Sequence, residues 1–139
     1  MNISQNQVRH GQKSVSKLAA ITKAGEVLLE NGFIEEEYIA SMLKKEESDI
    51  TYIGNGIAIP HGLNEDKKYV KTSGISVIHY PQGIKYDDNE AFIIIGIAGE
   101  DSVHLEILQE LAIKLSDEEY VKELIQTQTL DSFIEIFNQ

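Results

Sequence analysis

The stretch Ile53-Gly-Asn-Gly-Ile-Ala-Ile-Pro-His-Gly62 decides how the rest of this chain is arranged. Its apolar run, residues 57–59, lies between a glycine turn and a proline, which predicts a short buried strand with an abrupt end. Gly54 and Gly56 can adopt the positive φ values that a tight turn needs. Pro60 has no N–H to donate to a sheet, so the strand is expected to end there.

A single histidine follows this strand. His61 is therefore expected on a rigid mount, and Gly62, which lacks a side chain, is expected to leave one flank of the imidazole open. A chemically versatile side chain with open access suits a nucleophile. The competing interpretation is a histidine in a surface turn that takes part in no chemistry.

The apolar spacing on either side of this stretch predicts alternating helices and strands. Helices are expected at residues 14–31 and 35–45, from Asp101 or Ser102 onward, from the capping box at 116–119 onward, and at 130–137. Strands are expected around Ile3 or Val8 and at 57–59, 73–80 and 92–98, with a turn at 81–83 and a loop at 87–89. The buried positions expected in the helix after residue 101 are Leu105, Leu108, Leu111, Ala112 and Leu115.

The strand expected at 92–98 is apolar at every position, which is typical of a central strand covered by helices. Because helices and strands interleave, the sequence predicts the α/β class, with a mixed, mostly parallel sheet and helices on both faces. The 139 residues contain no repeat and no linker, so a single domain over residues 1–139 is expected.

Composition excludes several classes of function. The formal net charge of −11 argues against a nucleic-acid partner, and no run approaches the ~18 apolar residues of a membrane span. Residues 1–7 lack the basic and apolar regions of a signal peptide. The chain has no cysteine, which excludes disulfides and thiolate metal sites. We therefore expect a cytoplasmic protein that does not insert into a membrane.

Familiar catalytic motifs are absent. No P-loop, GxGxxG, GxSxG or HExxH pattern occurs, so nucleotide binding, serine hydrolysis and zinc proteolysis have no local support. The four histidines do not lie at short metal-ligand spacing, and neither a metal nor a cofactor is predicted. Arg9 is the only arginine, so a bound phosphate would depend on lysine, histidine, backbone amides and helix N-termini.

His104 is the second candidate for chemistry. It falls in the first turn of the helix that follows the strand at 92–98, near free N–H groups and the positive end of the helix dipole. An anion would be stabilised there; the alternative is an exposed first-turn residue without a function. His79 shares a strand face with Val77 and Ile75, so it is expected in or near the core.

Several segments resemble a known family. Residues 51–62, Thr-Tyr-Ile-Gly-Asn-Gly-Ile-Ala-Ile-Pro-His-Gly, resemble the active-site segment of the mannitol/fructose class of enzyme IIA components of the bacterial phosphoenolpyruvate-dependent sugar phosphotransferase system. The mannitol branch is the most similar. The similarity runs from about Lys13 to the C-terminus and includes Lys71-Thr-Ser-Gly74, Tyr80-Pro-Gln-Gly83, residues 92–98 and His104-Leu-Glu-Ile-Leu108. The most specific part is the Ala-Ile-Pro-His core with its glycine lead-in.

The resemblance implies phosphoryl transfer between proteins. The histidine matching His61 would accept a phosphoryl group from the phosphocarrier protein HPr and pass it to a cysteine of the IIB component of a sugar permease. The histidine matching His104 would help to hold the group. The residues themselves are compatible with this chemistry, because a neutral imidazole is a competent nucleophile near pH 7. Transfer depends mainly on positioning and charge neutralisation, so no metal or small cofactor is implied.

One position departs from the family's pattern. Where mannitol-type members carry an arginine shortly before the active-site segment, this chain has Lys45. Lysine keeps the charge but lacks the planar, bidentate fork. Lys45 is expected either to neutralise phosphate with weaker orientation or only to cap its helix. The departure leaves open a regulatory paralogue whose phosphorylation controls binding to another protein. A third alternative is an unrelated binding domain with a coincidental histidine loop.

Overall fold

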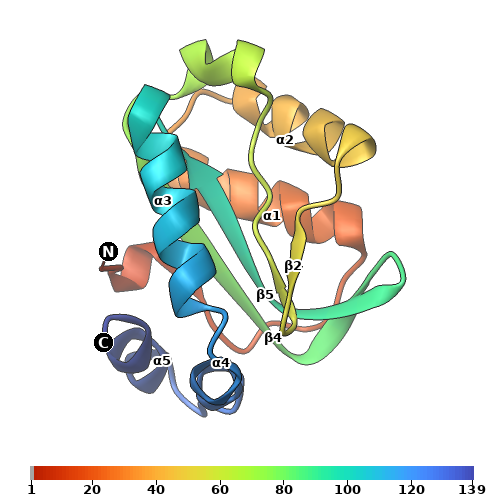
Figure 1. The fold of residues 1–139 in the computed structure, drawn as a ribbon, viewed down its shortest axis with the longest axis vertical. Helices are drawn as coiled ribbons and strands as arrows, with labels where there is room; N and C mark the ends of the chain where they lie inside the picture. The colour runs from red at the N-terminus through yellow and green to blue at the C-terminus, as the bar shows by residue number, and fades with distance from the viewer. Residues whose placement is uncertain (1) are drawn as a thin grey trace.

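A five-stranded sheet forms the centre of the molecule in the order β1-β4-β5-β3-β2. Figure 1 labels three of its strands, β2, β4 and β5. The computed structural model describes residues 2–139. The strands are β1 (Val8–Arg9), β2 (Tyr52–Gly54), β3 (Ile57–Ala58), β4 (Gly74–Tyr86) and β5 (Asn89–Ala98). The helices are α1 (Lys17–Glu30), α2 (Glu37–Ser48), α3 (Asp101–Lys114), α4 (Glu118–Ile125) and α5 (Leu130–Phe137). Two short 3-10 helices, η1 (Gln5–Gln7) and η2 (Asn64–Tyr69), complete the fold.

The mixed sheet is confirmed, but the prediction that it is mostly parallel is wrong. β1 pairs with β4 and β3 pairs with β5 in parallel, whereas β2–β3 and β4–β5 are antiparallel. The longest pairing, β4–β5, is a hairpin closed at Asp87 and Asp88, where Asp87 has a φ of 57°. A hairpin turn of this kind makes neighbouring strands antiparallel, whatever the rest of the topology.

β4 is longer than predicted and runs through the expected turn at 81–83. Its register with β5 shifts between His79 and Ile84, so the proline and glycine of this segment lie in an irregular part of the strand. β1 pairs with β4 only at Val77 and Ile78. Pro81 therefore lies beyond the part of β4 that β1 covers, where a missing backbone N–H is tolerated.

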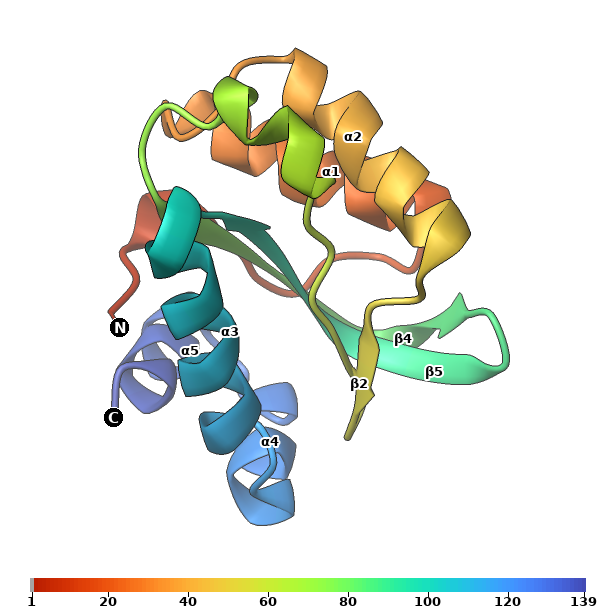
Figure 2. The ribbon, with the colours of Figure 1, turned by 45° about the horizontal axis from the view of Figure 1, so that its top comes forward.

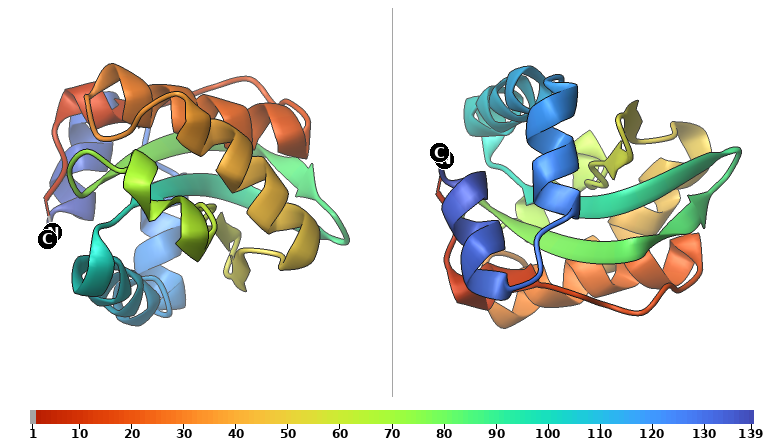
Figure 3. Two further views of the ribbon diagram at one scale, coloured as in Figure 1. Left: turned by 90° about the horizontal axis from the view of Figure 1, so that it is seen from above. Right: turned by 90° about the horizontal axis from the view of Figure 1, so that it is seen from below.

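Helices cover both faces of the sheet, as predicted. Figures 2 and 3 show α1 and α2 on one face and α3, α4 and α5 on the other. β5 supplies alternate residues to the two cores: Ile94 and Ala98 pack with the α1–α2 layer, and Ile93, Ile95 and Ile97 with the other layer. This alternation explains why the whole strand is apolar, since both of its faces are buried.

The observed helix bounds agree with the prediction from sequence more closely than the buried positions of α3 do. Ser16 caps α1 by accepting a hydrogen bond from Ala19 N, and α5 has the predicted bounds. The prediction for α3 is partly wrong: Leu105 is 58% exposed and Ala112 is exposed. The buried positions are Ile107, Leu111 and Leu115, a single row at i, i+4 spacing. A helix that meets the core along one row buries fewer positions than its apolar content suggests.

Two predicted helix caps are also wrong. Glu100, rather than Asp101 or Ser102, occupies the N-cap position of α3. Asp117, rather than Ser116, caps α4, because its Oδ1 accepts hydrogen bonds from Glu119 N and Tyr120 N.

Candidate functional site

Backbone pairing with β5 holds His61 at the end of the sheet. The turn before β3 has the predicted positive φ values, 97° at Gly54 and 77° at Gly56. After β3, His61 forms a parallel bridge with Ile97 of β5, and Ile97 N donates a hydrogen bond of 3.0 Å to Pro60 O. The predicted rigid mount is therefore present.

One ring nitrogen of His61 is committed to the backbone. Nδ1 lies 2.8 Å from Ile59 O, and a carbonyl oxygen can only accept, so Nδ1 carries the proton. The neutral ring then has its lone pair on Nε2. Burial lowers the pKa of His61, the charges of Lys45 and Lys67 lower it further, and Ile59 and Glu46 oppose the shift. Near pH 7 His61 is thus a neutral imidazole with a free Nε2.

His104 lies beside His61, as the prediction of a helix N-terminus at this end of the sheet requires. Their ring centroids are 5.0 Å apart. A Cβ at Gly99 would lie only 2.5 Å from His104 Cα, so the absent side chain lets α3 start close to the end of β5. Burial, followed by the charges of His61, Lys67 and Lys45, lowers the pKa of His104 to about 4. His104 is therefore also neutral near pH 7.

Lys45 lines the same pocket as both histidines. Its Nζ also lies 3.0 Å from Asp49 Oδ2, one helical turn further along the chain. Both alternatives from the sequence are thus compatible with its place, since Lys45 lines the pocket and its ammonium pairs with the C-cap residue of its helix. The pocket is completed by Gly62, Leu63, Asn64 and Glu65.

The prediction for Gly62 is wrong in its reason. A Cβ at this position would lie 2.5 Å from Tyr38 Cε1 and 2.9 Å from Ser41 Oγ. The missing side chain makes room for α2 rather than opening a flank of the imidazole. Tyr38 OH accepts a hydrogen bond from Gly62 N and donates one to Ile97 O, and Ser41 Oγ accepts one from Leu63 N.

Two contributors to the site were missed from the sequence. Tyr38 has the spacing of a core residue in the helix predicted at 35–45, and nothing in that spacing distinguishes a core tyrosine from one that anchors the histidine loop. Lys67 lies in a charged stretch that has the composition of a loop, but the structure places it half-buried in η2, and its charge lowers the pKa of both site histidines. The contact of η2 with α2, seen in Figure 2, brings this lysine towards the site.

The arrangement suits a phosphoryl group better than a metal. Within residues 2–139, no group of three or more histidine, cysteine or acidic side chains could hold a metal ion. The pocket instead joins an imidazole nitrogen with a free lone pair, a second imidazole and a lysine near the N-terminus of α3. Such groups stabilise the negative charge of a transferring phosphoryl group.

Comparison with known proteins identifies a family that covers the whole chain. Residues 1–139 match the family described as "Phosphoenolpyruvate-dependent sugar phosphotransferase system, EIIA 2". The mannitol-specific phosphotransferase enzyme IIA component of Bacillus subtilis is 41% identical, over 99% of this chain and 96% of that protein.

Among the residues of this chain that the structure describes, no helix is long and apolar enough to cross a membrane.

Solved structures agree with the sequence comparison. The crystal structure of IIA mannitol from Escherichia coli has a TM-score of 0.90 and 33% identity, over 98% of this chain and 99% of that one. An Escherichia coli complex of enzyme IIA with phosphorylated enzyme IIB for mannitol gives a TM-score of 0.89 and 33% identity, over 97% and 96%. The chain belongs to the EIIA 2 family of the phosphoenolpyruvate-dependent sugar phosphotransferase system.

Proposed function

We propose that this protein is the phosphoryl carrier of a mannitol-type sugar uptake system in the cytoplasm. His61 Nε2 accepts the phosphoryl group from phospho-HPr and passes it to a cysteine of the IIB component of the permease. The observation that carries this proposal is the hydrogen bond between His61 Nδ1 and Ile59 O, because it leaves Nε2 free to attack. The relatives named for mannitol and the structure of a IIA–IIB complex support the choice of substrate class and partner.

The transfer step needs no external acid or base. The N–P bond of the donor phosphohistidine breaks while a new bond forms from His61 Nε2 to phosphorus. The proton stays on Nδ1, which continues to donate its hydrogen bond to Ile59 O. Lys45 and the N-terminus of α3 balance the charge of the phosphoryl oxygens, and the neutral His104 can donate a hydrogen bond to one of them; stabilising these oxygens is the main requirement of such a transfer.

Reconstitution tests this proposal directly. The full chain is incubated with phosphoenolpyruvate, enzyme I and HPr, and an acid-labile phosphate is sought by ³¹P NMR and mass spectrometry. We expect one phosphoryl group per chain and its loss when a mannitol-type IIB protein is added. A chain that never accepts phosphate would contradict the proposal.

Complementation separates the carrier from the regulatory paralogue. The gene is introduced into a strain that lacks its own mannitol-type IIA component. A carrier is expected to restore uptake of the polyol, whereas a protein that is phosphorylated only to control another protein is not.

Lys45 is expected to contribute through its charge. Lys45→Ala removes the ammonium from the pocket and should slow transfer from phospho-HPr by about tenfold to about a hundredfold, the value of one charge-assisted hydrogen bond. Lys45→Arg supplies the fork of the family's arginine and should react at least as fast as the wild type. Rapid-quench measurement with Lys44→Ala, an exposed neighbour, as the control checks both. Unchanged rates in Lys45→Ala and Lys45→Arg alike would exclude the role.

A further inference from the structure

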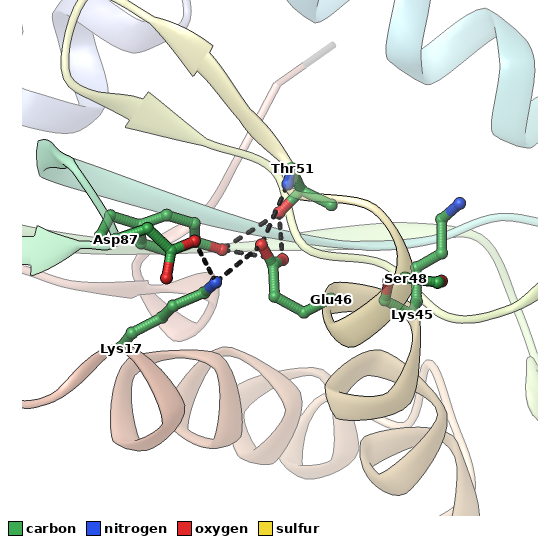
Figure 4. A network of polar contacts seen from close by, with 7 residues as sticks. Lys17, Lys45, Glu46, Ser48, Thr51 and Asp87 are labelled. Carbon is green, nitrogen blue, oxygen red and sulfur yellow. Dashed lines mark hydrogen bonds and ion pairs between the residues drawn. The ribbon is translucent and has the colours of Figure 1, made fainter.

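A buried carboxylate lies directly behind the site, in the residue after Lys45. The side chain of Glu46 is 2% exposed. Its Oε1 accepts hydrogen bonds from Thr51 Oγ1 at 2.6 Å and from Tyr86 OH at 3.0 Å. Its Oε2 accepts one from Thr51 N at 3.0 Å and lies 3.3 Å from Lys17 Nζ (Figure 4). A buried charge is tolerated only with partners of this kind.

These contacts join four separate parts of the chain. Lys17 belongs to α1, Glu46 to α2 and Tyr86 to the end of β4, while Thr51 directly precedes β2. Lys17 also forms an ion pair of 2.6 Å with Asp87 of the hairpin turn. Burial alone would lower the pKa of Lys17, but Asp87 and Glu46 raise it, so the ammonium stays charged. Glu46 therefore connects these four parts of the chain.

A series of hydrogen bonds leads from Glu46 to the imidazole of His61. Glu46 fixes Thr51 through both its backbone N–H and its hydroxyl. Thr51 O accepts a hydrogen bond of 3.0 Å from Ile59 N. Ile59 O in turn accepts the proton on His61 Nδ1, at 2.8 Å. The position of the Glu46 carboxylate thus determines the position of Ile59 O, the carbonyl oxygen that orients the His61 imidazole.

The same carboxylate fixes the end of α2 that carries Lys45. Lys45 and Glu46 are consecutive, and Figure 4 shows their side chains on different sides of the helix. Glu46 points inward to the network, while Lys45 lines the pocket. Ser48 Oγ closes this last turn with a hydrogen bond of 3.0 Å to Lys45 O. Anchoring Glu46 consequently limits the movement of Lys45.

We propose that Glu46 is a positioning residue that fixes the Lys45 ammonium and the His61 imidazole relative to each other for phosphoryl transfer. The inference rests on the function proposed above. Glu46 is buried, so it acts through these two residues rather than by touching a partner protein. Positioning of this kind matters because a misplacement of about 1 Å can slow a reaction about a hundredfold.

Glu46→Gln tests the proposal with little change in shape. An amide nitrogen cannot accept, so part of the bonding to Thr51 and Tyr86 is lost and Lys17 keeps only Asp87 as its counter-ion. At saturating phospho-HPr, the transfer rate should fall by about tenfold to about a hundredfold, with the half-saturating concentration unchanged within about twofold. The ¹⁵N NMR spectrum of the imidazoles should show that His61 is no longer a single Nδ1–H tautomer.

Glu47→Gln is the matched control. It removes the same charge from the next residue of α2, where the side chain is exposed, and should keep the wild-type rate and imidazole spectrum. Thr51→Val removes only the hydroxyl. It should show the effects of Glu46→Gln in weaker form. If Glu46→Gln does not fold, the transfer rate and the imidazole spectrum of Thr51→Val decide whether this network positions His61.

Three outcomes have distinct meanings. A folded Glu46→Gln protein with the wild-type rate and a single His61 tautomer would overturn the proposal. A change in half-saturation alone would also overturn it, because it would place the effect of Glu46 in partner docking. If the wild type accepts no phosphate, the proposed function fails, and the tautomer measurement still decides whether Glu46 orients His61.

Discussion

His61→Asn is expected to abolish phosphoryl acceptance while the protein stays folded. The amide N–H of asparagine can replace the Nδ1–H donor to Ile59 O, so the loop keeps its anchor. The nucleophilic Nε2 has no counterpart in the substitute. Because removal of a nucleophile leaves only binding and electrostatic effects, acceptance of phosphate from phospho-HPr should fall at least about a thousandfold. Rapid-quench assays and intact-mass spectrometry measure this loss.

His104→Gln is the matched comparison for that experiment. The substitute keeps a hydrogen-bond donor in the first turn of α3 but has no imidazole. It should still accept phosphate at His61, at a rate reduced by about tenfold to about a hundredfold, since one stabilising group is altered. If His61→Asn still accepts phosphate and peptide mapping finds it on His104, the two histidines have exchanged roles and the assignment of the nucleophile is wrong.

The main parts of the site could be predicted because each depends on local sequence. The Gly54–Gly56 turn, the stop at Pro60 and the helix start before His104 are short-range features, and each one puts a histidine near the end of the sheet. That both histidines meet, with ring centroids 5.0 Å apart, depends on β3 and β5 being neighbours in the sheet. The central position of the apolar strand at 92–98 made this pairing foreseeable.

The supporting residues could not be predicted because their partners are distant in sequence. Tyr38 bonds to Gly62 and Ile97, which lie 24 and 59 residues away. Glu46 depends on Tyr86, 40 residues away, and on Lys17. In the sequence, Tyr38 has the spacing of a core residue and Glu46 that of a solvated acid. Only the tertiary arrangement shows that Tyr38 anchors the loop and that Glu46 is buried.

The lowered pKa values of the histidines indicate that acid destabilises the fold. The clearest case is His79, which lies outside the site. His79 is fully buried and stacks on His10, with ring centroids 4.2 Å apart. Its Nδ1 accepts a hydrogen bond of 3.0 Å from Gly11 N, and its Nε2 lies 2.9 Å from Ile125 O. The ring must therefore be neutral, with the proton on Nε2. Burial lowers the pKa of His79, the charge of His10 lowers it further, and Ile125 opposes the shift.

The sign of the effect follows from this lowered pKa. In the unfolded chain His79 binds a proton with a pKa of 6.5, the ordinary value for histidine, whereas in the folded protein it binds one only at lower pH. The stability that neutral His79 provides is complete above the unfolded pKa of 6.5 and is lost as the pH falls towards the lower pKa of the folded protein. Within this window one proton changes the free energy of unfolding by up to about 1.4 kcal/mol per pH unit.

His79→Gln should remove this part of the pH dependence. Glutamine can accept from Gly11 N with its oxygen and donate to Ile125 O with its nitrogen, and it does not titrate. Urea unfolding is followed by circular dichroism at pH 8, 7, 6 and 5, since the chain has no tryptophan. Below pH 6.5 the slope of stability against pH should be smaller in the variant by up to about 1.4 kcal/mol per pH unit.

The measurement at pH 8 is the internal control, because His79 is neutral there in both the folded and the unfolded chain. A difference at pH 8 reports the packing and hydrogen bonding of glutamine in place of the ring, which contacts both His10 and Phe133. Only the additional difference at pH 5 reports titration. Equal slopes in the two proteins would mean that His79 does not carry the acid sensitivity. The lowered pKa of His10, His61 and His104 would then have to account for it.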